Sequence, residues 1–137
     1  MKESASDKPD APMRISSVAG VMTVIVGLGI ILIGIREFLQ PAVAARGFGV
    51  PLLDSHDGDL LAIKAARDVA SGILALTFLG LRQRRNLAYA LSVLTLIPIF
   101  DGLIVLRHAA WLFTPTLLIH WGTALFMIVT VGLLRCA

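Results

Sequence analysis

The sequence predicts an all-α integral membrane protein, a bundle of four transmembrane helices with short loops and a disordered N-terminal tail. Composition is the first observation: 57% of the 137 residues are hydrophobic and only 15% are charged, against about 25% charged in a typical soluble domain. The mean hydropathy is +0.86. The second observation is the recurrence of apolar runs of about 20 residues, the length that crosses a bilayer. The third is that short polar segments separate these runs.

The first helix is predicted at residues 16–39, after a polar tail at residues 1–15 whose composition is typical of disorder. Within this helix, Gly20, Gly27 and Gly34 recur every seven residues and fall close to one face. A face of small residues lets a neighbouring helix approach closely, so the repeat predicts helix packing.

A cleaved signal peptide is the alternative for this first segment, because Ala42-Val43-Ala44 resembles a cleavage site. The apolar run is longer than the core of a normal signal peptide, and Arg36 and Glu37 intervene before the site. An uncleaved first helix is therefore favoured.

Pro41 is predicted to end the first helix, and the glycine- and aspartate-rich segment that follows is predicted to be a loop. Asp54, His56, Asp57 and Asp59 in this loop raise the alternative of a calcium or other metal site. Their spacing departs from that of an EF-hand loop, whose ligands stand at alternate positions with a glutamate at the end. A solvated loop with a helix N-cap is favoured, and no metal is predicted.

Three further helices are predicted at residues 60–81, 87–106 and 115–134. Pro98 lies inside the third predicted helix, where a proline frees a backbone carbonyl and bends the helix beside polar sites. The single cysteine, Cys136, excludes an intrachain disulfide and a cysteine-based metal site.

Charge predicts the orientation of the transmembrane domain, residues 16–137. The basic residues of the tail, of residues 82–85 and of Arg135 lie on one side if the chain crosses four times. The positive-inside rule then places both termini of this multi-pass protein in the cytoplasm. A net charge of +3, scattered along the chain, does not indicate nucleic-acid binding. The outer-side exceptions are Arg36, Arg46 and Arg107.

The main functional signal is a charged stripe in the second predicted helix. Lys64, Arg67, Asp68 and Ser71 follow i, i+3, i+4, i+7 spacing and share one helical face. Ionisable groups inside a membrane segment are expensive unless they are paired or hydrated, and they usually mark functional sites.

Other helices bring polar groups to the same depth. At 1.5 Å per residue, Arg67 and Asp68 lie roughly 10–12 Å below the outer surface, Asp101 roughly 8 Å and His120 roughly 8–10 Å. The sequence therefore predicts a polar layer in the outer half of the bundle. Its members are Arg36, Glu37, Lys64, Arg67, Asp68, Asp101 and His120.

This layer is suited to acid–base catalysis on a lipophilic small molecule. Burial favours the neutral carboxylic acid and a nearby arginine favours the carboxylate, so Asp68 and Asp101 can take opposite roles as acid and base. Arg67 would orient a carboxylate, and His120 would serve as a relay or second base. No organic cofactor is predicted, since no nucleotide or haem signature occurs. The supporting residues are Arg36, Glu37, Lys64, Ser71 and Trp121.

Two alternatives use the same residues differently. In a structural scaffold, pairs such as Arg67 with Asp101 or Lys64 with Asp68 would only lock helices in register. In a proton-coupled transporter or binding subunit, the carboxylates would relay protons. Four helices are few for alternating access, so the transporter would require a homo-oligomer.

The chain resembles a family of small four-helix membrane proteins known as domain of unknown function 4267. The resemblance rests on Arg36 and Pro41, then Phe48-Gly49, and covers about residues 15–135. It continues through Lys64-Ala-Ala-Arg67-Asp68 with Gly72, then Asp101 and His120.

The resemblance implies an activity as well as a fold. Similar small membrane proteins accompany fungal polyketide pathways, where the opening of epoxides is assigned to them. It therefore implies an epoxide hydrolase, acting through Arg67, Asp68, Asp101 and His120. Soluble limonene-type epoxide hydrolases are similar in residue types only, since they combine aspartates with an arginine on a different fold.

Overall fold

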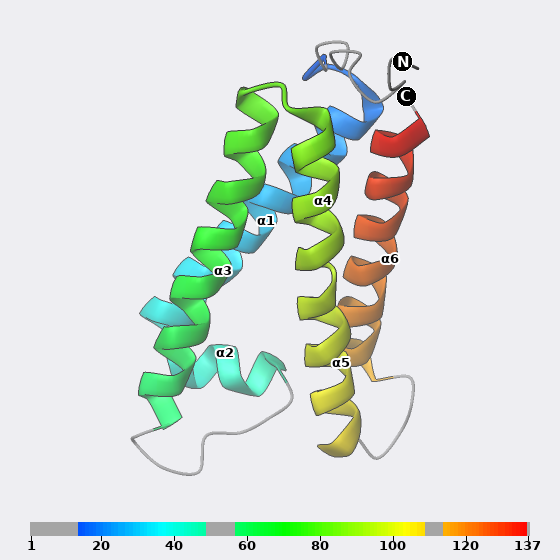
Figure 1. Ribbon diagram of the computed structural model, residues 1–137. Helices are drawn as coiled ribbons and strands as arrows, with labels where there is room; N and C mark the ends of the chain where they lie inside the picture. The colour runs from blue at the N-terminus through cyan, green and yellow to red at the C-terminus, as the bar shows by residue number, and fades with distance from the viewer. Residues whose placement is uncertain (1–13, 49–56, 109–113, 137) are drawn as a thin grey trace, which may run out of the picture.

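The computed structural model describes residues 14–48, 57–108 and 114–136, and every described element is helical (Figure 1). The first thirteen residues of the predicted tail lie outside this part, as do Asp54 and His56 of the acidic segment. The described helices that overlap the four predicted segments are α1 (Val18–Leu39), α3 (Asp57–Gly80), the α4–α5 pair, and α6 (Pro115–Cys136). The predicted count of four is not confirmed, because α2 (Pro41–Phe48) is a further helix and the third predicted segment is divided in two.

The prediction that Pro41 is followed by a loop was wrong. Gln40 leaves the helical conformation with φ −137° and ψ 63°, and Pro41 then begins α2 (Pro41–Phe48). A proline is favoured at the first position of a helix because its missing N–H has no partner there in any case. Asp57 and Asp59 likewise belong to the first turn of α3 rather than to a loop, where carboxylates favour the helix N-terminus.

The third predicted helix consists of two segments, α4 (Arg84–Leu94) and α5 (Leu96–His108), which run on from each other through Thr95 (Figure 1). The Thr95 hydroxyl donates a 2.6 Å hydrogen bond to the Leu91 carbonyl, and Pro98 lies one turn further on without an N–H to donate. The segments together form a 25-residue apolar helix.

Three helices of the described part are long and apolar enough to cross a membrane, namely α1, the α4–α5 helix and α6. They indicate a membrane protein. The 24-residue α3 is comparable in length but carries Lys64, Arg67 and Asp68 within its apolar portion. Composition alone therefore does not mark α3 as a crossing, and the fourth crossing remains a prediction.

Glycines bring α1 and α3 into close contact, as the seven-residue repeat predicted for two of its members. A Cβ atom on Gly34 would lie 2.7 Å from the backbone oxygen of Ala65, and one on Gly27 would lie 2.7 Å from the Leu76 side chain. A Cβ on Gly72, from the α3 side, would lie 2.5 Å from the Gly27 oxygen. Gly20 instead packs against the chain entering its own helix.

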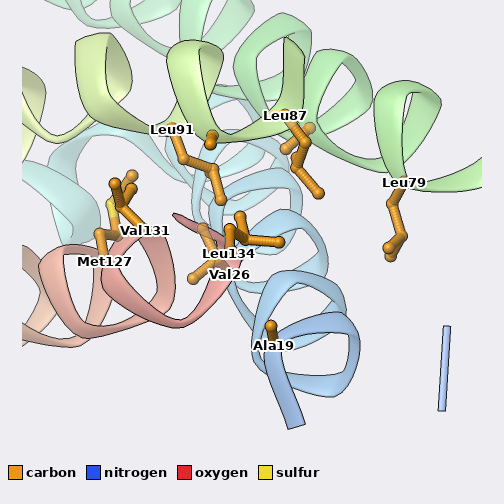
Figure 2. Close-up of a cluster of buried hydrophobic side chains, with 10 residues drawn as sticks. Ala19, Val26, Leu79, Leu87, Leu91, Met127, Val131 and Leu134 are labelled. Carbon is orange, nitrogen blue, oxygen red and sulfur yellow. The ribbon is translucent and has the colours of Figure 1, made fainter. Parts of the chain in front are cut away.

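The main apolar core lies at the end of the bundle where α1 begins and α6 ends (Figure 1). Leu87 and Leu91 of α4 meet Met127 and Leu134 of α6 there, and all four are almost fully buried (Figure 2). The short α2 crosses the opposite end of the bundle. This division leaves the α2 end free to hold a polar cavity.

Candidate functional site

A cavity of about 370 Å³ lies in the half of the bundle nearer α2, between α1, α2, α3, the α4–α5 helix and α6. Much of its wall is apolar, with Ile30 and Ile33 from α1, Ile97 from α5, and Ile119 and Met127 from α6. Charged and polar side chains also reach the cavity. They are Arg36, Glu37, Lys64, Asp68, Asp101, Thr116, His120 and Thr123.

Lys64 joins two carboxylates into a cluster formed by Glu37, Lys64 and Asp68, which we call the lysine–carboxylate cluster. Its Nζ lies 2.8 Å from Glu37 Oε1 and 2.6 Å from Asp68 Oδ2. The two carboxylates are 6% and 7% exposed and the lysine side chain 16%. Buried ions need such partners, because an unpaired charge in a poorly hydrated site is strongly unfavourable.

Local geometry explains why this cluster forms. Lys64 and Asp68 are four residues apart on α3, so their side chains are neighbours on one face. Glu37 lies in the last turn of α1, three residues after Gly34, whose missing side chain lets the two helices approach. The pair between Lys64 and Glu37 therefore links α1 to α3 at the cavity.

One oxygen of the cluster has no partner among the described residues. Glu37 Oε2 is fully buried, and no residue of the described part donates a hydrogen bond to it. Glu37 is one of the residues that line the cavity. A buried acceptor without a donor costs about 1–3 kcal/mol, and more when it is charged.

Asp101 and His120 approach the cavity from α5 and α6. Asp101 makes no hydrogen bond or ion pair with any residue that the structure describes, although Lys64, Arg67 and Asp68 are close enough for their charges to act on it. The His120 ring meets the edge of Phe48 from α2, with centroids 4.9 Å apart and planes at 73°. Phe48 also lies 5.1 Å from Lys64 Nζ, so α2 covers the polar part of the cavity.

All members of the predicted polar layer except Arg67 line one cavity, and two of the predicted supporting residues, Ser71 and Trp121, lie outside its lining. Arg67 lies outside the lining: its side chain is 52% exposed and its Nε is 3.7 Å from Asp68 Oδ1. Ser71 is also outside, and its hydroxyl donates to the Arg67 carbonyl at 2.8 Å. Trp121 packs against Gly102 of α5, where an added Cβ would lie 3.2 Å from the indole.

Sequence reasoning missed three contributors to the site. Phe48 entered only as part of a family motif, because the segment around it was predicted to be a loop. Thr116 and Thr123 on α6 also line the cavity. The threonines lie four residues before and three residues after His120, and that spacing on one helical face was the available signal.

The cavity combines three carboxyl groups, an amine, an imidazole and a guanidinium with apolar walls. Such a set can donate and accept protons at a bound molecule and can hold a polar group of a mostly apolar one. Within residues 14–48, 57–108 and 114–136, no three His, Cys, Asp or Glu side chains are grouped so as to hold a metal ion.

These features define a small helical membrane protein with a polar cavity inside one half of its bundle. Residues 27–134 match the model of the domain of unknown function DUF4267, and the chain belongs to that family. Comparisons with curated proteins and with solved structures found no match.

Proposed function

We propose that this protein is an integral-membrane enzyme that acts on a lipophilic small molecule by acid–base catalysis, most concretely by opening an epoxide with water. The observation that carries the proposal is the 370 Å³ cavity, into which Glu37, Asp68, Asp101 and His120 all open. This volume is at the lower end of the range for small-molecule sites. A purely structural set of ion pairs has no need of such a void.

The apolar part of the wall favours a lipophilic substrate. Ile33 and Ile119 line the cavity and are also 49% and 61% exposed, so the wall between α1 and α6 is apolar where it meets the outside of the bundle. A substrate dissolved in the bilayer would meet this wall first. Its polar group would then turn toward the lysine–carboxylate cluster and Asp101.

In the proposed reaction, Asp101 in its neutral form donates a proton to the epoxide oxygen. A carboxylate across the cavity takes a proton from the attacking water, the role for which Asp68 was predicted. Arg67 lies against Asp68 rather than against the cavity, so it orients that carboxylate without touching the substrate. His120 stands beside α5 and relays the proton between turnovers.

The proposal includes four crossings with both termini in the cytoplasm. The support is that α3 runs beside α1, that Lys64 and Asp68 of α3 turn toward the cavity or α1, and that α1 begins at the end where α6 finishes (Figure 1). Arg82, Arg84 and Arg135 gather at that same end, in accord with the positive-inside rule.

A structural scaffold is the second candidate, favoured by the lysine–carboxylate cluster itself. The pair between Lys64 and Glu37 joins α1 to α3 and would fix their register without any ligand. Asp101 separates the two candidates, because it has no partner in the described part and a scaffold gives it no role.

The test is turnover by the purified protein in lipid nanodiscs. Styrene oxide, limonene oxide and methyl 9,10-epoxystearate are incubated with it in ¹⁸O-labelled water, and labelled diols are measured by mass spectrometry. The wild type is expected to form a labelled diol, and Asp101→Asn to form it at least about 100-fold more slowly. Thr23→Val, a buried change on α1 at the far end from the cavity, is the control. Absence of turnover by the wild type, or full activity in Asp101→Asn, would contradict the proposal.

A further inference from the structure

The charged groups of the cavity are confined to the end nearer α2. Its lining there includes Glu37 of α1, Asp101 of α5 and His120 of α6. A Cβ atom added to Gly102 would lie 3.4 Å from the His120 Cβ, so Asp101 and His120 stand at the same level of neighbouring helices. Lys64 is bonded to Glu37, and its charge also acts on Asp101 and His120. These side chains form the polar end of the cavity.

Seven residues away along the same helices, the lining is apolar. α1 and the α4–α5 helix run toward the α2 end and α6 runs away from it, so these positions lie toward the apolar core (Figure 1). They are Ile30 of α1, Leu94 of α4 and Met127 of α6. Ile30 and Leu94 pack against the core, of which Met127 is a member. The three side chains therefore close the cavity on the core side.

The level between these two ends is also largely apolar. Ile33 of α1 and Ile97 of α5 line the cavity there, together with Thr123 of α6. The Thr123 hydroxyl donates a 2.8 Å hydrogen bond to the carbonyl of Ile119 in its own helix. The cavity thus extends from the polar end to the core through an apolar arm.

The helical rise gives the length of this arm. At about 1.5 Å per residue, the seven residues between Asp101 and Leu94 span about 10 Å. Side chains of one helix tilt in the same direction, so the spacing of the Cα atoms carries over to the side chains. With C–C bonds of about 1.5 Å, an extended alkyl chain advances about 1.3 Å per carbon, so about eight carbons fill the arm.

The short helix α2 closes the cavity beyond the polar end. Its Phe48 ring lies 4.9 Å from the His120 ring and 5.1 Å from Lys64 Nζ. Ala44 and Gly47 of the same helix also line the cavity. A molecule that lies along the bundle therefore has room for an extended chain on one side of its polar group only.

We infer that the substrate is a terminal alkyl epoxide, with its ring at the polar end and one unbranched tail of about eight carbons directed to the core. This inference rests on the proposed epoxide opening and names the substrate class for it. Limonene oxide has no such tail and would leave the arm unfilled. An epoxide in the middle of a long chain, as in methyl 9,10-epoxystearate, carries a second chain that α2 obstructs.

The test is a series of 1,2-epoxyalkanes with tails of four to twelve carbons, hydrolysed by the protein in lipid nanodiscs. Substrate is expressed as a mole fraction of the lipid, which removes the partitioning of longer chains into the bilayer. The value of kcat/KM should be highest near eight carbons and at least about fivefold lower at four and at twelve. A short tail leaves part of the arm empty, and a long one meets the core.

Two variants should move this optimum in opposite directions. Ile30→Ala removes a side chain from the core end of the arm and should lengthen the best tail by about two carbons. Ile97→Phe adds bulk halfway along and should shorten the best tail to about four carbons. The matched controls are Leu28→Ala and Leu96→Phe, each on the same helix, 48% exposed and outside the lining, and both should keep the wild-type optimum.

Binding of the product 1,2-alkanediols, measured by calorimetry, separates this inference from the reaction on which it rests. Turnover that peaks near eight carbons, and moves in Ile30→Ala or Ile97→Phe but not in the controls, supports the inference. Diol binding with that same optimum but without epoxide turnover would retain the alkyl chain and overturn the epoxide. Equal turnover at all tail lengths, or faster turnover of limonene oxide, would overturn the inference and leave the reaction standing. Absence of both turnover and diol binding would overturn both.

Discussion

Replacing Lys64 by methionine should destabilise the bundle sharply. Methionine keeps most of the apolar stem of lysine but removes the amine that lies within 2.8 Å of Glu37 and 2.6 Å of Asp68. Both carboxylates are less than 10% exposed, so the change strands two buried acceptors at once. Removing one partner of a buried ion pair costs about 3–5 kcal/mol. With roughly 3 °C per kcal/mol for a chain of this size, Tm should fall by about 10 °C.

The assay is thermal unfolding in detergent, followed by circular dichroism at one fixed pH. The matched comparison is the triple variant Lys64→Met, Glu37→Gln, Asp68→Asn, in which all three members of the lysine–carboxylate cluster are neutral. Because a buried ion pair and its neutral replacement are often similar in stability, the triple variant should recover most of the lost Tm. The reasoning fails if Lys64→Met melts like the wild type, or if the triple variant is as unstable as the single one.

Three further predictions concern packing, the cavity and topology. Gly34→Ala should destabilise the protein by about 1–3 kcal/mol, because the added Cβ meets the α3 backbone. Gly29→Ala is the control and should not lower Tm, because a Cβ there has no atom within 4 Å. Equal losses of Tm in thermal unfolding would refute the close contact between α1 and α3. Phe48→Ala should raise KM for a lipophilic epoxide about 2–10-fold, because it removes an aromatic side chain that lines the cavity. An unchanged KM in steady-state kinetics would show that Phe48 does not contact the substrate. In sealed vesicles of known orientation, an impermeant maleimide should label the exposed Cys136 from the cytoplasmic side. The variant Asp59→Cys, made in a Cys136→Ser background, should be labelled from the opposite side. Labelling of both cysteines from the same side would exclude four crossings.

The helices could be predicted because uncharged runs near 20 residues leave few alternatives in a chain this apolar. The rise per residue predicted that seven polar side chains lie at one level along the bundle, and six of them line one cavity. The direction in which each side chain points around its helix was harder to predict from the sequence. A helix that faces lipid on one side and protein on the other is apolar all round, so periodicity does not separate the two faces.

Arg67 and Phe48 illustrate that limit. Arg67 shares the helical stripe of Lys64 and Asp68, yet the turn of α3 places its side chain at the surface, 52% exposed. Phe48 ends an eight-residue helix, too short for a hydrophobic period to emerge and flanked by the proline and glycine signals of a loop. The pairing of Lys64 with Glu37 depends on how closely α1 approaches α3. The spacing of residues along a single helix does not predict the distance between two helices.

The most direct test of the account is a crystal structure in a lipid mesophase with the diol product of a hydrolysed epoxide. The account predicts the diol in the cavity between α1, α3, α5 and α6, with one hydroxyl within hydrogen-bond distance of Asp101 and the other facing the lysine–carboxylate cluster. A diol bound elsewhere on the protein, or one whose hydroxyls face only the apolar wall while Asp101 points away, would contradict catalysis at this site.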